Sequence, residues 1–214
     1  MATLVTVLKG GGRYDASWVE RLSRGVRRHA PSFDRILCLT DLDLAIDGVT
    51  AVPLRHDWPA WWAKMEAFRP GLVAGTAVLC DLDTVLTGDA DALASPGAAV
   101  MEDHFLKGRA STALLRWQGD DLAHVHDAFA AEPERWMRPG SCGTVPNAVH
   151  GDQVVVDHLM RRAGGLPPFL QDVHPGLIDF YDPEKADPGP VVVFIGEAKP
   201  DNARGPVARH WHGD

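Results

Sequence analysis

The sequence predicts an α/β fold with a mostly parallel sheet flanked by helices and a small antiparallel part. Up to residue 83, short apolar runs alternate with segments of helical periodicity, and this order is typical of parallel sheets. From about residue 97 the predicted strands follow one another directly, which favours antiparallel pairing. The chain of 214 residues is 45% hydrophobic and has no internal repeat or linker, so we expect a single domain over residues 1–214.

The first half of the chain begins with an apolar, β-rich run at residues 3–8 that stops at the sequence KGGGRY. A helix is predicted next over residues 16–29, where apolar residues recur at helical spacing and Asp15 is placed to cap the first turn. The remaining predicted elements of this half are strands at 35–41, 48–54 and 76–83, and a helix at 60–70 that ends at Pro70.

The second half of the chain contains three predicted strands and two predicted helices. The helix over residues 150–164 has apolar residues at helical spacing, and Gly164 is a natural stop for it. The other predicted elements are strands at 97–103, 111–117 and 190–196 and a helix at 120–131. The segment after residue 196 is polar and rich in turn-forming residues.

Composition excludes several classes of protein. The formal net charge of −8 argues against nucleic acid as a partner. No apolar run reaches the roughly 18 residues of a membrane span. Residues 1–14 lack the features of a signal peptide, so we expect a cytoplasmic protein. The three cysteines have no metal-type spacing; Cys38 and Cys80 lie in apolar runs and are interpreted as core residues.

Polar residues gather where the predicted strands end. Ligands of such sheets bind beyond the carboxyl ends of the strands. Lys9–Arg13 follow the first strand, Thr40 and Asp41 end the second, and Asp81-Leu82-Asp83 end the central one. The glycines at 10–12 allow a close backbone approach to a ligand, although a plain tight turn explains them equally well. Neither a dinucleotide fingerprint nor a P-loop is present.

The two aspartates of the DLD motif are the most informative pair. In an extended segment residues two apart point to the same side, so Asp81 and Asp83 converge and Leu82 points into the core. Two converging carboxylates repel each other unless a proton or a cation holds them. Mg²⁺ or Mn²⁺, completed by diphosphate oxygens, is the natural partner. The simpler alternative is a solvated turn in which Asp81 caps the residues that follow.

Six motifs occur in an order that resembles one enzyme family. They are RILCLTD, WWAKMEAFRP, VLCDLDTVLTGDAD, STALLRW, HGDQ and VVVFIGEAKP. Together they make the chain similar to the compact bacterial GT-A glycosyltransferases, of the glycogenin and lipopolysaccharide galactosyltransferase type. The resemblance implies a GT-A-like fold and transfer of a sugar from a nucleotide-sugar donor, with UDP-sugar the expected donor and Mn²⁺ or Mg²⁺ on its diphosphate. The acceptor, whether glycan, lipid or protein, is left open.

The resemblance also implies roles for individual residues. Asp83 would ligate the metal, and Asp81 would lie toward the metal and the donor ribose. Lys64 would lie near the donor phosphates or sugar, and Asp152 and Gln153 would line the reacting face of the sugar, as in retaining members. The remaining implied donor contacts are Lys9, Gly10, Tyr14, Thr40, Asp41, Leu82 and Ser111. Simpler alternatives are a solvated Lys64 and an Asp152 that only caps its helix.

Two departures from the family pattern affect the expected site. Relatives often carry asparagine where Ser111 stands, so that sugar contact is shorter or lost. Many also have a histidine within the last motif as a third metal ligand, where Val193 and Ile195 fill the candidate positions. We therefore predict that the tail is extended, folds back over the strand ends and supplies His210 or His212 to the metal. A frayed terminus is the alternative.

Two other functions remain open on the sequence. DLDTV and GDQVVVD also fit the motifs of haloacid-dehalogenase-type phosphatases, in which Asp81 would be the nucleophile. About eighty residues precede the first motif, and no apolar strand precedes the second, which argues against that enzyme class. A nucleotide-sugar binding module without catalysis is the third possibility.

Overall fold

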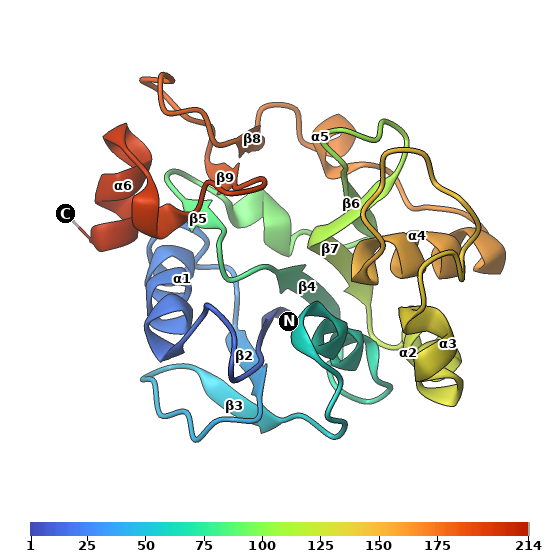
Figure 1. Cartoon of the computed structure of the whole chain (residues 1–214). Helices are drawn as coiled ribbons and strands as arrows, with labels where there is room; N and C mark the ends of the chain where they lie inside the picture. Colours follow the sequence, from blue (N-terminus) through green and yellow to red (C-terminus); the bar gives the residue numbers. More distant parts are fainter. Residues whose placement is uncertain (214) are drawn as a thin grey trace.

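The computed structural model describes residues 1–213 and has a six-stranded central sheet in the order β3-β2-β1-β4-β7-β6 (Figure 1). Strands β3, β2, β1 and β4 are parallel, and β7 pairs antiparallel with both β4 and β6. The predicted α/β class, with a mostly parallel sheet and an antiparallel part, is confirmed. The strands are β1 Ala2–Leu8, β2 Arg35–Thr40, β3 Thr50–Pro53, β4 Thr76–Cys80, β6 Ala99–Glu102 and β7 Ala110–Gln118.

A second, smaller sheet has the order β5-β9-β8. Its strands are β5 Val85–Leu86, β8 Ile178–Phe180 and β9 Val191–Val193. Strand β5 pairs antiparallel with β9, and β8 pairs parallel with it. Because β5 directly follows the DLD motif, this sheet brings the segment after residue 190 close to the end of β4.

Helices cover both faces of the central sheet (Figure 1). Leu4 and Leu8 of β1 face the side of α1, whereas Val5 faces the side of η1, α2 and α4. This alternation places apolar residues on both faces, as a buried parallel sheet requires. The helices are α1 Ala16–His29, η1 Ala60–Phe68, η2 Asp91–Ala94, α2 Ala123–Ala131, α3 Pro133–Met137, α4 Asp152–Ala163, α5 Leu170–Val173, η3 Pro200–Asn202 and α6 Gly205–His212.

Short elements such as β5, β8, α3 and α5 were not predicted, and three further differences concern segments with predicted site residues. The 60–70 helix is a 3₁₀ helix that ends at Phe68. Strand β4 ends at Cys80, and the backbone N–H of Thr84 donates to the carbonyl of Asp81, so the DLD motif lies in a turn. The expected extended tail is wrong, because residues 205–212 form α6, which lies beside α1 (Figure 1). The capping of α1 by Asp15 is confirmed, since its carboxylate accepts from the N–H of Ser17.

Among residues 1–213, no helix has both the length and the apolar character needed to span a membrane.

Candidate functional site

A cleft of about 520 Å³ opens at the carboxyl ends of β1 and β4. It is continuous in its lining with a smaller chamber of about 220 Å³ that lies toward β6 and β9. Both spaces are lined by five charged residues at their junction: Lys64, Asp81, Asp83, Asp152 and Lys199. The sequence predicts four of these residues as site residues, and the structure brings them together from η1, the turn after β4, and the first turn of α4.

Lys64 is the centre of this charged group. Its Nζ atom lies 3.0 Å from Oδ1 of Asp81 and 2.8 Å from Oδ2 of Asp152. Thr112 on β7 donates its hydroxyl to the same oxygen of Asp152 at 2.6 Å. These contacts contradict the alternatives in which Lys64 is a solvated helix residue and Asp152 only caps its helix. They fix two carboxylates on either side of one ammonium group.

Burial and charge act against each other at this lysine and its partner. Burial alone lowers the pKa of Lys64, but the nearby carboxylates of Asp152 and Asp81 outweigh it, and the pKa is raised. For Asp81, burial and the repulsion from Asp83 and Asp152 outweigh the attraction of Lys64 and raise the pKa to about 6. At neutral pH a carboxyl group with this pKa is mostly ionised, and a further cation beside it would lower the pKa again.

Asp83 is held by two groups from opposite ends of the chain. Its Oδ2 atom accepts from the hydroxyl of Tyr14 at 2.9 Å and from Nζ of Lys199 at 2.8 Å. Burial, together with the charge of Asp83, raises the pKa of Tyr14 and keeps its hydroxyl protonated. Leu82, between the two aspartates, is buried in the core on the α1 side and also lines the cleft.

Of the predicted donor contacts near β1 and β2, Lys9 and Tyr14 line the cleft, whereas Gly10, Thr40 and Asp41 lie outside its lining. Lys9 at the end of β1 forms ion pairs with Asp41 after β2 and with Asp57 after β3. The backbone N–H of Gly10 donates to Asp41 at 2.7 Å. A Cβ atom at position 10 would lie 2.8 Å from a methyl carbon of Leu42, so a larger residue would displace this exposed side chain. Thr40 is buried, and its hydroxyl accepts from the N–H of Leu42.

The smaller chamber contains Gln153 and Ser111 of the predicted site. Gln153 donates its amide to Oδ2 of Asp103 at 2.5 Å, and Asp103 also lines this chamber. Ser111 is buried, and its hydroxyl accepts a long hydrogen bond from the N–H of Ala113. Trp62 is a core residue, whereas Trp61 is half exposed and lines the cleft.

The predicted role of the tail histidines does not fit the structure. The His210 ring lies 5.5 Å from that of His29, the last residue of α1. Tyr14, which binds Asp83, precedes the first residue of the same helix, and 15 residues of helix span about 22 Å. His212 is exposed at the end of α6. In a helix residues two apart point to nearly opposite sides, so the two imidazoles do not converge on one ion. Neither lines the cleft or the smaller chamber, so neither completes a metal site there.

Sequence analysis missed Lys199 and Thr112 as members of the charged group. Lys199 stands in the VVVFIGEAKP motif, and the excess of carboxylates at the strand ends was the available signal that a second cation is needed. Its contact with Asp83 joins residues 116 positions apart in the chain. Thr112 stands in the STALLRW motif beside Ser111, where strand alternation turns neighbouring side chains to opposite faces.

The carboxylates at the strand ends fit a Mg²⁺ or Mn²⁺ ion that takes most of its ligands from the substrate. Such ions are commonly held by one or two carboxylates together with substrate phosphates. Tyr14 and Lys199 both contact Oδ2 of Asp83, so neither engages Oδ1. Val193 and Ile195 both line the smaller chamber, but their hydrocarbon side chains carry no ligand atom, so neither supplies a third ligand. The protein part of the site would therefore consist of Asp81 and Asp83.

Comparisons with known proteins identify the fold. No family model and no curated protein matches the chain. The apo form of the glycosyltransferase GlyE from Streptococcus pneumoniae TIGR4 superposes with a TM-score of 0.67 at 14% identity, covering 99% of this chain and 59% of GlyE. The galactosyltransferase LgtC, in complex with donor and acceptor sugar analogues, gives a TM-score of 0.66 at 10% identity, covering 99% of this chain and 95% of LgtC.

An active-site mutant of LgtC matches similarly, with a TM-score of 0.64 and 11% identity. The chain thus spans about three fifths of GlyE and nearly the whole of LgtC. The predicted GT-A-like fold is confirmed, and at these identities the likeness is one of fold.

Proposed function

We propose that this protein transfers a sugar from a nucleotide-sugar donor to an acceptor hydroxyl. The observation that carries the proposal is the position of Lys64, which joins Asp81 and Asp152 inside a cleft at the strand ends. The fold supports it, since LgtC of the same fold is solved with donor and acceptor sugar analogues. The cleft volume of about 520 Å³ lies within the range typical of small-molecule sites.

The donor is expected to lie along the cleft with its diphosphate at the charged junction. Lys9 and Tyr14 would border the nucleotide, which we propose to be uridine diphosphate, and Gln153 and Asp103 would border the sugar. A neighbouring hollow of about 300 Å³ is lined by the half-exposed Trp61 and by the strongly exposed Phe105 and Val149. Exposed aromatic faces suit the apolar face of a sugar ring, so we place a glycan acceptor there.

The reaction breaks the bond between the anomeric carbon and the diphosphate. The bonding electrons leave with the diphosphate, the acceptor oxygen forms a bond to the anomeric carbon, and the proton of the acceptor hydroxyl passes to an oxygen of the departing diphosphate. Lys199 and Lys64 lie where negative charge develops on the leaving group. The carboxylate of Asp152 and the amide oxygen of Gln153 would stabilise the positive charge that develops on the sugar.

A divalent cation completes the proposal. Asp81 and Asp83 would hold it, and when bound it supplies Lewis-acid stabilisation of the departing diphosphate. Because the two lysines already balance the aspartates, we expect the ion to bind together with the donor rather than before it.

A thermal-shift screen of nucleotide-sugars with and without Mn²⁺ tests donor binding. A donor at 100 times its dissociation constant should add about 2.7 kcal/mol to the free energy of unfolding. Asp83→Asn should abolish the metal-dependent part of the shift. Asp89→Asn is the matched control, since Asp89 is exposed on the same segment and lies outside the cleft. Equal donor turnover in EDTA and in Mn²⁺ would show that the aspartates act without a metal.

Transfer is expected to retain the anomeric configuration. The carboxylates that line the smaller chamber are those of Asp81, Asp83, Asp103 and Asp152. Each already accepts a hydrogen bond from a neighbouring side chain, so none is free to act as a catalytic base. Proton NMR of the first-formed product measures the linkage directly. An inverted linkage would contradict this part of the proposal.

Two alternative functions have distinct outcomes in the same assays. A phosphatase would hydrolyse p-nitrophenyl phosphate and lose this activity in Asp81→Asn. A binding module would show a donor-induced thermal shift but neither transfer nor slow donor hydrolysis. The GT-A-like fold and the ion pair that occupies Asp81 favour sugar transfer over both.

A further inference from the structure

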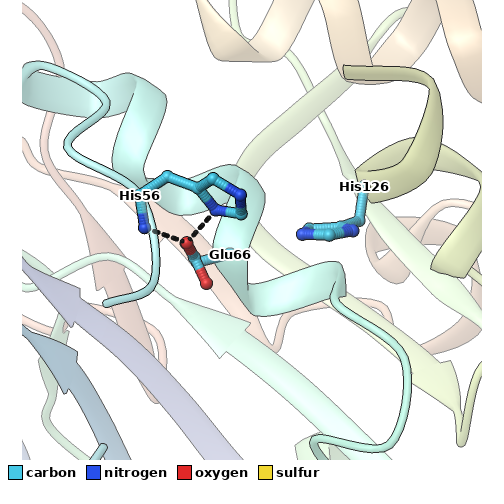
Figure 2. A group of neighbouring side chains, drawn as sticks. All are labelled: His56, Glu66 and His126. Atoms are coloured by element: carbon cyan, nitrogen blue, oxygen red, sulfur yellow. Dashed lines mark hydrogen bonds and ion pairs between the residues drawn. The ribbon is translucent and has the colours of Figure 1, made fainter. Parts of the chain in front are cut away.

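A second cluster of potential ligands lies on the other side of η1 from the cleft. It consists of His56 in the loop after β3, Glu66 on η1 and His126 on α2 (Figure 2). One ligand atom from each residue lies within 4.8 Å of the other two. None of the three lines the cleft or the smaller chamber, so the cluster is separate from the proposed donor site.

Glu66 fixes the orientation of His56. The Glu66 side chain is fully buried, and its Oε1 atom lies 2.6 Å from Nδ1 of His56. The same oxygen accepts from the backbone N–H groups of Arg55 and His56, and Oε2 pairs with Arg69. The contact with Oε1 occupies Nδ1 of His56 and leaves its Nε2 atom free as a ligand. Oε2 of Glu66 accepts only from Arg69 among the described residues, so it keeps a lone pair for an ion.

His126 carries the strongest sign of a missing ligand. The residue is 9% exposed, and its Nδ1 atom lies 3.1 Å from Oδ1 of Asp127. With the Nδ1 proton donated to this carboxylate, Nε2 presents a lone pair. Nε2 is buried and has no hydrogen-bond partner among the described residues. Figure 2 shows the His126 ring pointing edge-on toward Glu66 and His56.

A buried lone pair that faces a carboxylate and a second imidazole is unfavourable unless a cation lies between them. A proton on Nε2 would leave a buried donor without an acceptor. We propose that His56, Glu66 and His126 bind a transition-metal ion of the zinc class. Two imidazoles and one carboxylate suit Zn²⁺, with its fourth position open to water, whereas Mg²⁺ and Mn²⁺ prefer oxygen ligands.

The position of this site connects it to the cleft. The loop that carries His56 also carries Asp57, which pairs with Lys9 at the nucleotide end of the cleft. Trp58 of the same loop stacks on the His56 ring, with centroids 4.1 Å apart and planes within 2°. A bound ion would therefore hold the loop whose Asp57 pairs with Lys9, and Lys9 lines the cleft.

Zinc affinity of the full chain, measured by competition with a chromophoric chelator, tests the proposal. The wild type should bind one Zn²⁺ in the presence of saturating Mg²⁺, and Co²⁺ in its place should give the intense visible absorption of a tetrahedral site. His126→Ala should lower the affinity at least 100-fold. Asp127→Asn, which removes only the outer partner of His126, should lower it 10- to 100-fold and is too exposed to affect folding.

Two control variants separate this site from other histidines. His124→Ala changes an exposed histidine on the same helix, and His210→Ala breaks the pair with His29. Both should bind Zn²⁺ as the wild type does. A wild type that binds no Zn²⁺, or a folded His126→Ala and Asp127→Asn with unchanged affinity, would overturn the proposal. Loss of binding in His210→Ala alone would assign the ion to the His29–His210 pair and would also overturn it.

Discussion

At the scale of the residue, the cleft holds its carboxylates as ion pairs that a donor must rearrange. Asp81 is paired with Lys64 and Asp83 with Lys199, although each aspartate is placed where a metal and a diphosphate are proposed to bind. Asp81 costs stability in the free protein, because burial and the neighbouring carboxylates disfavour its charged form. These ion pairs lead to two predictions.

The first prediction is that Asp81→Asn stabilises the protein at neutral pH while removing the proposed activity. The pKa of Asp81 is raised from 3.8 to about 6, so the folded state binds more protons between these values. The free energy of unfolding therefore falls as pH rises through this window. A shift of this size corresponds to about 3 kcal/mol, and the 26% exposure of the side chain reduces the expected gain to about 1–2 kcal/mol.

Chemical denaturation in EDTA at several pH values measures this effect. Asparagine resembles the protonated carboxyl group, so the variant and the wild type should differ little below pH 3.8 and most above pH 6. A variant less stable than the wild type at pH 7.5 would show that the Lys64 pair stabilises the fold.

The second prediction concerns Lys199. Lys199→Ala removes a charge-assisted hydrogen bond to Asp83 and a cation from the proposed diphosphate site. Donor affinity should fall roughly 10- to 100-fold, while donor-free Mn²⁺ affinity should not fall, because Asp83 loses a competitor. Lys185→Ala is the matched control, since Lys185 pairs with Asp179 outside the cleft. Calorimetric titration with donor and with Mn²⁺ separates the two effects, and an unchanged donor affinity would contradict the prediction.

At the scale of the element, the sequence predicts what periodicity can encode. The strands of the central sheet and the helices α1, α2 and α4 follow from apolar spacing and from caps such as Asp15. Strands β5 and β8 contain two and three residues, too few to show a pattern, and they form because β9 pairs with both. The contact between Lys199 and Asp83 depends on this small sheet, so local sequence could not predict it.

Helix α6 carries signals in its sequence that predict a helix. Pro206 stands in its first turn, and Val207 and Trp211 are four residues apart, on one helical face. Both residues are buried against the α1 side of the molecule. The extended metal-binding tail was predicted because His210 and His212 are two residues apart. The same spacing occurs in α6, which packs through Val207 and Trp211 instead.

A third prediction is that α6 contributes to stability through Trp211. Its ring packs on Trp18 at 4.9 Å, and the guanidinium of Arg21 lies 5.1 Å from its centroid. Trp211→Ala should therefore lower the free energy of unfolding by about 3–5 kcal/mol. His212→Ala, the next residue and exposed, should change it by less than about 0.5 kcal/mol. Equal stabilities of the two variants in urea would show that α6 does not pack as described.

At the scale of the whole molecule, the central sheet separates two apolar cores, and the cleft lies at the carboxyl ends of its strands β1 and β4. Cys38 and Cys80 belong to the core on the α1 side, and Cys142 packs against the other core. Burial raises the pKa of Cys38 and of Cys80 to about 12, so neither thiol reacts from the folded state near neutral pH. Labelling of these thiols therefore reports how often the molecule opens.

The fourth prediction uses Cys80 to connect ligand binding with global opening. Cys80 immediately precedes Asp81, so exposure of its thiol must break the charged junction of the cleft. A donor at 100 times its dissociation constant should add about 2.7 kcal/mol of stability and slow the labelling of Cys80 about 100-fold, provided that reclosing is faster than labelling. Cys142, half-buried in a loop segment, opens locally and should slow much less. Mass spectrometry of alkylated peptides resolves the sites. A Cys80 rate that saturating donor leaves unchanged, at a concentration that shifts the melting temperature, would place the donor site away from the DLD turn.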